Sequence, residues 1–383
     1  MTTANPMRLL FSKLGRFHWP LFLLVLALCC ASVAFVHSAT YFAEGEAHNM
    51  WISQICWLGI GMAVFFVVAL IDYHLWIEHA WILFAGVLLM LFLVLIPHVG
   101  INHLGARRWL GYGSASIQPA ELTKPAVILM LAWLLCKVPQ RGFKMCCQVA
   151  GLIALPVGLI LLQPDLGSAS VLFPIAFAMM YVAGVRKRYL ALPVLFILAV
   201  VGYTYFGVHL HGWRVPGLKD YQMERIQVFY DPSRDPLNRG WTINQSLIAI
   251  GSGGLNGKGF LKGTQNMLGF LPRNISYNDF IFAVIGEDFG FRGGAALICT
   301  LTAVLLTCVF IASRADDNAG ALLVSGIVAL LFTHFFVNIG MTIKVVPITG
   351  IPLPFISYGG TFLVICLAAI GLVQSVWIHR RVR

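Results

Sequence analysis

The sequence predicts an all-α polytopic membrane protein with ten transmembrane helices. Its 383 residues are 59% hydrophobic and only 11% charged, and their mean hydropathy is +0.84. A soluble domain has roughly a quarter of its residues charged, so the soluble globular class is excluded. A helix needs about 20 apolar residues to cross a hydrocarbon core about 30 Å thick. Ten stretches meet this length: 19–38, 53–71, 80–97, 119–137, 147–163, 167–185, 189–209, 281–313, 319–340 and 359–379.

The net charge is +11, and the Lys and Arg residues lie mostly in alternate loops and at the two termini. This distribution is typical of a membrane protein and argues against nucleic acid as a partner. Loops on the cytoplasmic side of a membrane protein are enriched in Lys and Arg. Both termini are therefore predicted to be cytoplasmic, in agreement with an even number of spans. The short outer loops carry only Arg107, Arg108 and Lys344. The inner loops and termini carry Arg8, Lys13, Arg16, Lys137, Arg141, Lys144, Arg186, Lys187, Arg188, Arg314, Arg380, Arg381 and Arg383.

The chain is predicted to form a single integral membrane domain over residues 1–383. Its one long connection, about 210–278, joins the seventh and eighth spans on the outer side. A loop longer than about 15 residues is usually functional or disordered. This loop mixes Trp, Tyr and Phe with Arg and Asp and has an apolar periodic stretch at 243–250. We expect an ordered platform of short helices lying on the membrane surface.

Asp279 is the first candidate for chemistry, because it lies where a polar outer loop meets an apolar helix. The surrounding sequence is LPRNISYNDFIFAVIGEDFG, residues 271–290. A carboxylate at the edge of a membrane is costly and is a functional-site candidate. The alternative is that Asp279 only caps the helix that follows it. Glu287, Asp288 and Arg292 follow at near-helical spacing and can satisfy one another.

Three more charged residues lie near the outer side of the spans. Glu121 and Lys124, in QPAELTKPAVI, are three residues apart and share one helix face. They form either an ion pair that only offsets the cost of burial or the charged wall of a polar cavity opening outward. Asp165, in QPDLGSA, belongs to a site or simply caps the sixth span.

Two segments rich in glycine or proline interrupt the helices. GSGGLNGKGF, residues 251–260, is not a phosphate-binding P-loop, because Ser252 replaces a required Gly and Gly259 a required Ser or Thr. We expect a backbone bend there, with Lys258 as a residue able to face a phosphate. PITGIPLPFISYGG, residues 347–360, breaks the backbone between the last two spans. Such backbone persists at membrane depth only where it lines a cavity or is buried in protein.

Five segments together resemble the SEDS family (shape, elongation, division and sporulation), in the same order and over most of the chain after about residue 100. The segments are QPAELTKPAVI, QPDLGSA, NQSLIAIGSGGLNGKGF, NDFIFAVIGEDFGFRG and NIGMTIKVVPITGIPLPFISYGG. Within the family, MTI followed by VPITGIPLPFISYGG is similar to the elongation (RodA) branch rather than the division (FtsW) branch.

The resemblance implies a ten-helix peptidoglycan glycosyltransferase that polymerises lipid II into β-1,4 glycan strands. It would act at the outer face of the bacterial cytoplasmic membrane, in cell-wall elongation and cell shape. The implied partners are a class B penicillin-binding protein, which is a transpeptidase, and other proteins of the elongation complex. The family's essential aspartate corresponds to Asp279, the Glu and Lys of its fourth span to Glu121 and Lys124, and its Gln-Pro-Asp-Leu-Gly aspartate to Asp165.

The chain departs from the family pattern at three places. Tyr277-Asn278 replaces His-Thr before the aspartate, with a longer link from Leu271-Pro272. The histidine of the family pattern is therefore absent from this position. Lys344 stands where a glycine is usual, and Thr361-Phe362 replaces a common Ser-Ser.

The implied reaction transfers a glycan from an α-linked polyprenyl pyrophosphate to the 4-hydroxyl of an acceptor sugar, with inversion. A sugar hydroxyl is a poor nucleophile, and a carboxylate base typically contributes about a hundred- to ten-thousand-fold. We expect Asp279 to be this base, with Glu121 and Lys124 shaping the polar cavity. The leaving pyrophosphate needs positive charge from Arg, Lys or a divalent cation. Candidates for substrate binding are Asp165, Arg108, Arg225, Arg239, Lys258 and Lys344.

The cofactor and the class of function leave alternatives open. Mg²⁺ or another divalent cation held by Asp279 is one alternative, and no organic cofactor is expected. A lipid II flippase, a non-catalytic scaffold and an FtsW-like division polymerase are the rival functions. Polymer made from lipid II by the purified protein without a gradient separates the enzyme from the flippase and the scaffold.

Overall fold

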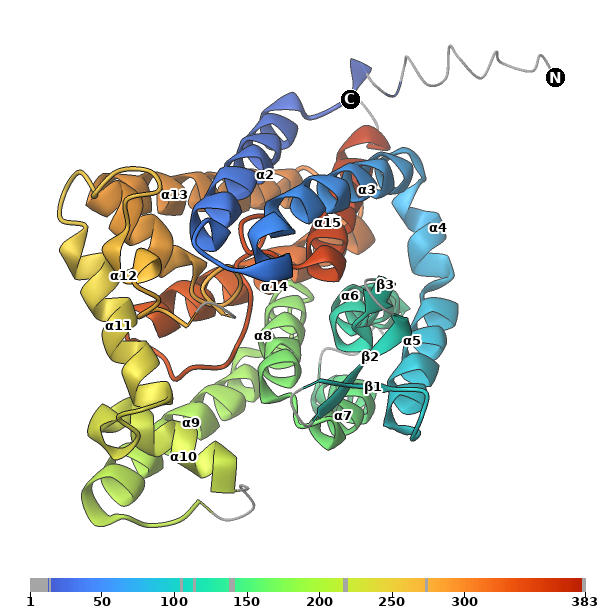
Figure 1. Ribbon diagram of the computed structural model, residues 1–383. Coiled ribbons are helices and arrows are strands. Elements are labelled where there is room, and N and C mark those ends of the chain that lie inside the picture. Colours follow the sequence, from blue (N-terminus) through green and yellow to red (C-terminus); the bar gives the residue numbers. More distant parts are fainter. Residues whose placement is uncertain are drawn as a thin grey trace.

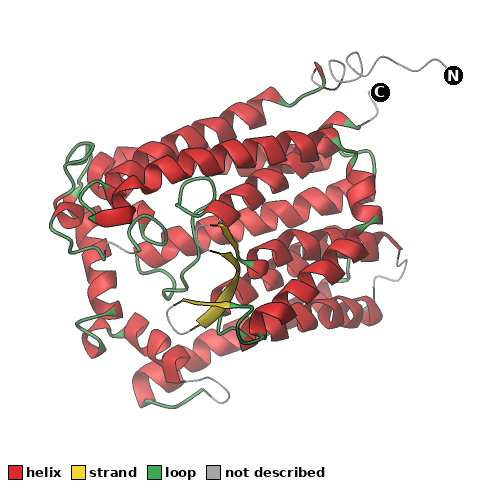
Figure 2. Ribbon diagram, turned by 45° about the vertical axis from the view of Figure 1, so that its right-hand side comes forward, coloured by secondary structure: helices red, strands yellow, loops and turns green. Residues whose placement is uncertain are grey.

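The protein is a bundle of membrane-spanning helices with a smaller layer of shorter helices along one side (Figures 1 and 2). The computed structural model describes residues 13, 15–103, 106–112, 115–137, 142–215, 220–272 and 275–380. In this part of the chain, eight helices are long and apolar enough to cross a membrane, and two shorter apolar helices bring the number to the ten predicted. Four of the cationic residues expected on the cytoplasmic side lie outside the described residues: Arg8, Arg141, Arg381 and Arg383.

The spans begin and end within a few residues of their predicted bounds. Apolar helices form here because a bilayer offers the backbone no other hydrogen-bond partners. They are α2 (Trp19–Thr40), α3 (Met50–Leu70), α5 (Ala80–Leu95), α6 (Pro119–Lys137), α7 (Phe143–Leu162), α8 (Leu166–Val182), α9 (Lys187–Tyr203), α13 (Ile281–Ser313), α14 (Asn318–Thr342) and α15 (Gly360–Ile378).

Helix α14 lies at the centre of the bundle and packs against α6, α8, α13 and α15. Its buried residues fall on several sides of the helix, as expected for a span surrounded by protein. The start of α2 and the end of α15 lie side by side, because the rings of His18 and Trp377 are 4.7 Å apart. The first and last spans therefore begin and end on the same side of the bundle, as an even number of spans requires. A short helix, α4 (Tyr73–Glu78), joins α3 to α5 on this side.

A three-stranded antiparallel sheet, in the order β1-β2-β3, adds to the all-α architecture. It consists of β1 (Ile101–His103), β2 (Ala106–Tyr112) and β3 (Ala115–Ile117) and lies between α5 and α6. In β2 and β3, Leu110 pairs with Ile117 and Gly111 with Ser116. Strands this short carry too little alternation to be predicted. The sheet matters because β2 carries Arg108 toward the turn before α8.

The long connection between α9 and α13 is largely helical, as predicted. Helix α9 continues as a π-helical turn over Thr204–Leu210. The connection then forms α10 (Asp220–Tyr230), a 3₁₀ turn at Pro232–Arg234, α11 (Arg239–Ser252) and α12 (Thr264–Met267). Helix α11 packs against α13 and α14, so this layer is attached to the bundle. Its position on a membrane surface stays a prediction.

Helix α13 is interrupted at Gly290, whose φ of 63° and ψ of −161° are not helical. The segment 254–259 takes the place of the missing helical hydrogen bonds. The amides of Lys258 and Gly259 donate to the carbonyls of Glu287 and Asp288, and the amide of Phe291 donates to the carbonyl of Gly254. The glycine-rich run predicted as a bend therefore inserts into a break in a span.

Close backbone contact explains why glycines are needed in this bend. A Cβ on Gly253 would lie 2.0 Å from the carbonyl oxygen of Gly286, and one on Gly257 would lie 2.2 Å from that of Asp288. Gly257 also has a positive φ of 77°, which side-chain-bearing residues rarely adopt. The break also separates Arg292 from the two acidic residues, so the mutual pairing predicted for Glu287, Asp288 and Arg292 is wrong. Glu287 Oε1 instead accepts from Lys258 Nζ at 2.6 Å, and Asp288 accepts from the Ser38 hydroxyl.

Candidate functional site

Asp279 lies two residues before α13 and does not cap it. The N-cap residue is Phe280, which makes no side-chain capping bond. Among the described residues, no hydrogen bond reaches the Asp279 carboxylate. Burial raises the pKa of Asp279 to about 6, while nearby Arg225 lowers it and Asp165 raises it. The carboxylate is therefore free to accept a proton from another molecule, and its pKa is suited to a base near neutral pH.

The backbone around Asp279 is held in place by the segment between α14 and α15. The amide of Tyr358 donates to the carbonyl of Tyr277 at 2.9 Å, and Ser357 Oγ donates to the carbonyl of Asn278 at 2.6 Å. Asn338 Nδ2, from α14, donates to the carbonyl of Asp279 itself at 3.0 Å. Three consecutive carbonyls are thus bonded, while the carboxylate is left available. The irregular 347–360 segment is buried in protein at this point, as its sequence predicted.

Glu121 and Lys124 form a buried ion pair one helical turn apart on α6. Lys124 Nζ donates to Glu121 Oε1 at 2.6 Å. The side chain of Lys124 is 1% exposed and that of Glu121 is 6% exposed. Lys124 Nζ also lies 3.1 Å from His334 Nε2 of α14. Since an ammonium group only donates, Nε2 is the acceptor, and Nδ1 donates to the carbonyl of Pro352 at 3.1 Å.

Asp165 caps α8 and also joins this charged group. Its Oδ1 accepts from the amide of Ser168 at 3.0 Å, and its Oδ2 accepts from Ser168 Oγ and from Gln118 Nε2 at 3.0 and 3.2 Å. Ser168 Oγ lies 3.4 Å from Glu121 Oε1. The capping interpretation is confirmed, and the same contacts link Asp165 to Glu121 through one hydroxyl group.

The segment 349–351 lies between Asp165 and Asp279. A Cβ on Gly167, at the start of α8, would lie 2.9 Å from the carbonyl oxygen of Thr349. A Cβ on Gly350, whose φ is 73°, would lie 3.3 Å from Asp279 Oδ2. The structure therefore brings four charged residues to one region around the 349–351 loop: Glu121, Lys124, Asp165 and Asp279.

The five predicted cationic candidates differ in their surroundings. Arg225, on α10, lies near Asp279, because its positive charge lowers the pKa of that carboxyl group. Its Nη1 also lies 3.4 Å from the carbonyl oxygen of Ile348. Arg108 donates to the carbonyls of Gln163 and Pro164, directly before Asp165. Both guanidinium groups therefore border the region of Asp165 and Asp279.

The other three candidates have different roles in the structure. Arg239 pairs with Glu224 at 3.0 Å within the outer helices. Lys258 pairs with Glu287 at 2.6 Å beside the break in α13. Lys344 has a φ of 58°, which accounts for the glycine usual at this position. Substrate binding by these residues stays a prediction.

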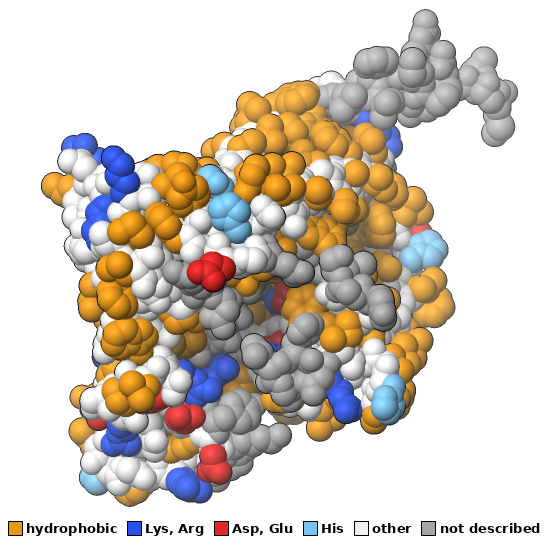
Figure 3. All heavy atoms as spheres, in the orientation of Figure 1, with side chains coloured by type: hydrophobic (Ala, Val, Ile, Leu, Met, Phe, Trp, Pro, Cys, Tyr) orange, Lys and Arg blue, Asp and Glu red, His pale blue; other side chains and the backbone are white. Residues whose placement is uncertain are grey.

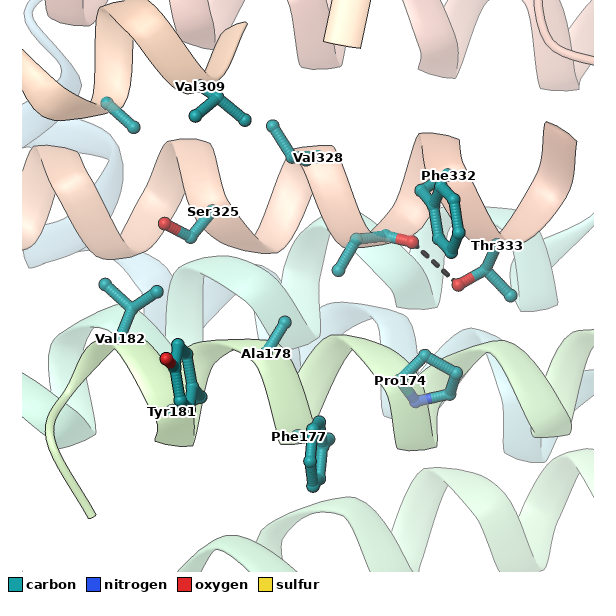
Figure 4. A pocket seen from close by; sticks show the side chains of 12 residues that line it. Pro174, Phe177, Ala178, Tyr181, Val182, Val309, Ser325, Val328, Phe332 and Thr333 are labelled. Carbon is teal, nitrogen blue, oxygen red and sulfur yellow. Dashed lines mark hydrogen bonds between the residues drawn. The ribbon is translucent and has the colours of Figure 1, made fainter. Parts of the chain in front are cut away.

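The surface of the protein has a polar recess and, elsewhere, an apolar groove. Figure 3 shows a recess near the middle of one face, with acidic and basic side chains inside it. A second cavity of about 430 Å³ lies between α8, α13 and α14 and is lined by Phe177, Val309, Val328 and similar residues (Figure 4). Its Thr333 hydroxyl bonds to the carbonyl of Ala329 in its own helix at 2.7 Å. The residues that line this groove include no Lys or Arg that could bind a pyrophosphate.

The residues present fit a divalent cation only with help from a substrate. Among the described residues, no group of three or more His, Cys, Asp or Glu side chains is placed to hold a metal ion. Mg²⁺, however, commonly binds through one or two carboxylates together with substrate phosphates and waters. Asp279, with Asp165 nearby, meets this smaller requirement.

Two residues of the site, His334 and Asn338, were missed in the sequence. They lie four residues apart in THFFVNIG, so they share one face of α14. Polar side chains inside an apolar span are a signal of function. The fold and this site together define a multi-pass membrane protein with a buried polar centre built from α6, α8, α14 and the start of α13.

Comparison with known proteins identifies the family. The sequence pattern of the family that joins FtsW, RodA and SpoVE, described as "Cell cycle protein", matches residues 19–382. The chain is 35% identical to the peptidoglycan glycosyltransferase RodA of Treponema pallidum, over 94% of this chain and 97% of the relative. It is 34% identical to a probable peptidoglycan glycosyltransferase FtsW of Geobacter metallireducens, over 96% of each.

A solved structure has the same fold. Its subject is the structural coordination of polymerization and crosslinking by a peptidoglycan synthase complex. One of its chains superposes with a TM-score of 0.77 at 31% identity, covering 94% of this chain and 97% of that one. The chain therefore belongs to the SEDS family of peptidoglycan glycosyltransferases.

Proposed function

We propose that this chain is the elongation-type (RodA-like) member of its family and polymerises lipid II for cell-wall elongation and cell shape. Relatives of similar identity carry both RodA and FtsW names, so overall similarity does not favour either branch. The support for elongation is the segment MTI with VPITGIPLPFISYGG in 341–360. Loss of the protein in its own cell should then give rounded cells, whereas a division polymerase should give filaments.

Asp279 is the general base of the proposed reaction. The observation that carries this role is a carboxylate that accepts no hydrogen bond from the described residues, on a backbone bonded at three consecutive carbonyls, with burial raising its pKa to about 6. Asp279 takes the proton of the acceptor's 4-hydroxyl as the oxygen forms a bond to C1 of the donor sugar. The bond from C1 to the pyrophosphate breaks, and its electron pair leaves with the pyrophosphate.

Positive charge near Asp279 stabilises the departing pyrophosphate. Arg225 and Arg108 border the site and are the first candidates, with Lys344, Lys258 and Arg239 farther along the outer face. Fixed charges aimed at a developing anion are often the largest contribution to catalysis. A divalent cation held by Asp279 and the pyrophosphate would supply the same neutralisation, and its removal by a chelator would then lower the rate.

The buried pair Glu121–Lys124 and Asp165 form the wall of the proposed cavity. Their contacts with Ser168 and His334 fix them in one arrangement, which limits reorganisation during the reaction. The active face is the outer one, with both termini in the cytoplasm. This orientation follows the distribution of Lys and Arg among the loops.

The proposed partner is a class B penicillin-binding protein, alongside other proteins of the elongation complex. The solved relative belongs to a peptidoglycan synthase complex that coordinates polymerization and crosslinking. In this chain, the helices α10 to α12 and the 347–360 segment present the outer surface nearest the site. A partner resting there would stabilise the arrangement of Arg225 with Asp279.

A polymerisation assay tests the proposal. Purified protein in detergent, given lipid II and no ion gradient, should form glycan polymer visible on a gel. Asp279→Asn should abolish polymer because the amide keeps the shape but cannot accept the proton. Asp220→Asn is the matched control, since the Asp220 side chain is 92% exposed and, among the described residues, pairs with Arg214 at 3.5 Å. Transbilayer movement of lipid II without polymer would instead support the flippase.

A further inference from the structure

Asn338 is a fully buried polar side chain in an apolar span, and it bonds to two separate segments of the site. Its Nδ2 donates to the carbonyl of Asp279 at 3.0 Å and to the carbonyl of Ile351 at 2.7 Å. Its exposed fraction is 0%. Burying an amide group is costly unless it is hydrogen-bonded, so these two bonds are a substantial part of what holds Asn338 there.

The orientation of the Asn338 amide is set by its partners. Both partners are carbonyl oxygens, which only accept, so the NH₂ group must face them. Both of its hydrogens are used in this way. The Oδ1 atom on the other side is buried and has no hydrogen-bond partner among the described residues. Toward the described residues, the side chain therefore acts as a double donor.

The two carbonyls belong to two segments that meet at the site, the one before α13 and the 350–352 loop. Asp279 carries the proposed base, and Ile351 follows Gly350, the residue beside the Asp279 carboxylate. One turn earlier on α14, His334 bonds to the carbonyl of Pro352 and to Lys124. A single face of α14 thus connects the Asp279 backbone, the 350–352 loop and the Glu121–Lys124 pair.

We propose that Asn338 is a positioning residue that sets where the Asp279 carboxylate lies relative to the bound acceptor sugar. This inference rests on the proposed role of Asp279 as the base. Asn338 bonds to the backbone of the same residue that carries the carboxylate, so a shift of that backbone moves the carboxylate directly. Asn338 itself is not placed against the reacting atoms and acts through Asp279.

Two variants separate positioning from simple packing. Asn338→Leu keeps a similar volume but removes both donors, and Asn338→Ala removes volume and donors together. Thr333→Val is the control, because the Thr333 hydroxyl on the same helix bonds to the carbonyl of Ala329 in that helix at 2.7 Å and to no other described residue. We expect both Asn338 variants to lose about 10- to 100-fold in kcat, the effect of a misplaced catalytic group, with the KM for lipid II within about threefold of wild type.

The measurements are kcat and KM in the polymerisation assay, with the folded fraction checked by thermal melting in detergent. If either folded Asn338 variant keeps the wild-type kcat, or if its loss of rate only follows the loss of folded protein, the inference is wrong. If one variant fails to fold, the other decides the outcome by the same criteria. Asp279→Asn is measured in parallel. If that variant polymerises lipid II, the proposed base is wrong; if it is inactive while Asn338→Ala keeps its kcat, only the positioning inference fails.

Discussion

Lys124 Nζ lies 2.6 Å from Glu121 Oε1, and the two residues are 1% and 4% exposed as a whole. Breaking a buried ion pair by removing one partner leaves an unpaired charge in a low-dielectric region. The energetic consequence of this geometry is therefore a strong coupling between the two residues.

The first prediction is a double-mutant cycle with Glu121→Gln, Lys124→Met and the double variant. Each single change should lower the free energy of unfolding by about 3 kcal/mol or more, and the double change by less than the sum. Thermal melting and polymer yield are the two measurements. The pair Asp231 and Arg234 has the same three-residue spacing at 3.5 Å but is 42% and 46% exposed, so it serves as the control. Additive effects at 121 and 124 would mean that the residues do not interact.

The second prediction concerns the pH dependence of the rate. Because the pKa of Asp279 is about 6 and the base must be ionised, kcat/KM should be constant above that pH and fall about tenfold per unit below it. Arg225 lowers this pKa and Asp165 raises it. The midpoint should therefore move up in Arg225→Gln and down in Asp165→Asn. Midpoints that stay together in all three proteins would assign the titration to another group.

The third prediction separates the two roles of Lys258. Its ammonium lies 2.6 Å from Glu287 Oε1, and Glu287 is fully buried. Lys258→Met should lower the melting temperature, because Glu287 loses its counter-charge, and Lys258→Met with Glu287→Gln should recover part of it. A raised KM for lipid II at an unchanged melting temperature would instead show that Lys258 binds the substrate.

The fourth prediction concerns the partner. A class B penicillin-binding protein whose transpeptidase serine is mutated should still raise the rate of lipid II polymerisation. Binding raises activity only if it favours the competent arrangement over others. The comparison is turnover with and without saturating partner. A stable complex with unchanged turnover would show that no such coupling exists.

The spans could be predicted because a membrane requires long apolar runs. Four candidate residues could also be predicted, because a charged residue near the end of an apolar span is unusual: Glu121, Lys124, Asp165 and Asp279. Their mutual contacts could not be predicted. Asp165 meets Glu121 through the Ser168 hydroxyl, and these residues come from helices distant in the sequence. The roles of His334 and Asn338 depend on which loop carbonyls lie beside α14, and only the folded chain shows this.

The break in α13 was also beyond prediction. The only charged residues in the run 281–313 are Glu287, Asp288 and Arg292, so its length and composition indicate one continuous helix. The interruption at Gly290 depends on the 254–259 segment supplying replacement hydrogen bonds, which is a long-range contact. The short sheet at 101–117 was missed for a similar reason, since its strands are stabilised by pairing with each other.

The 254–259 segment is bonded to both sides of the break in α13. The carbonyls of 287–288 accept from the amides of 258–259, and the amides of 291–292 donate to the carbonyls of 254–255. Local opening of a protein follows such bonded units rather than the boundaries of helices. The amide hydrogens of 258–259 and of 291–292 should therefore exchange with solvent deuterium at the same time. The remainder of α13 should retain its hydrogens on a different timescale, set by the bundle.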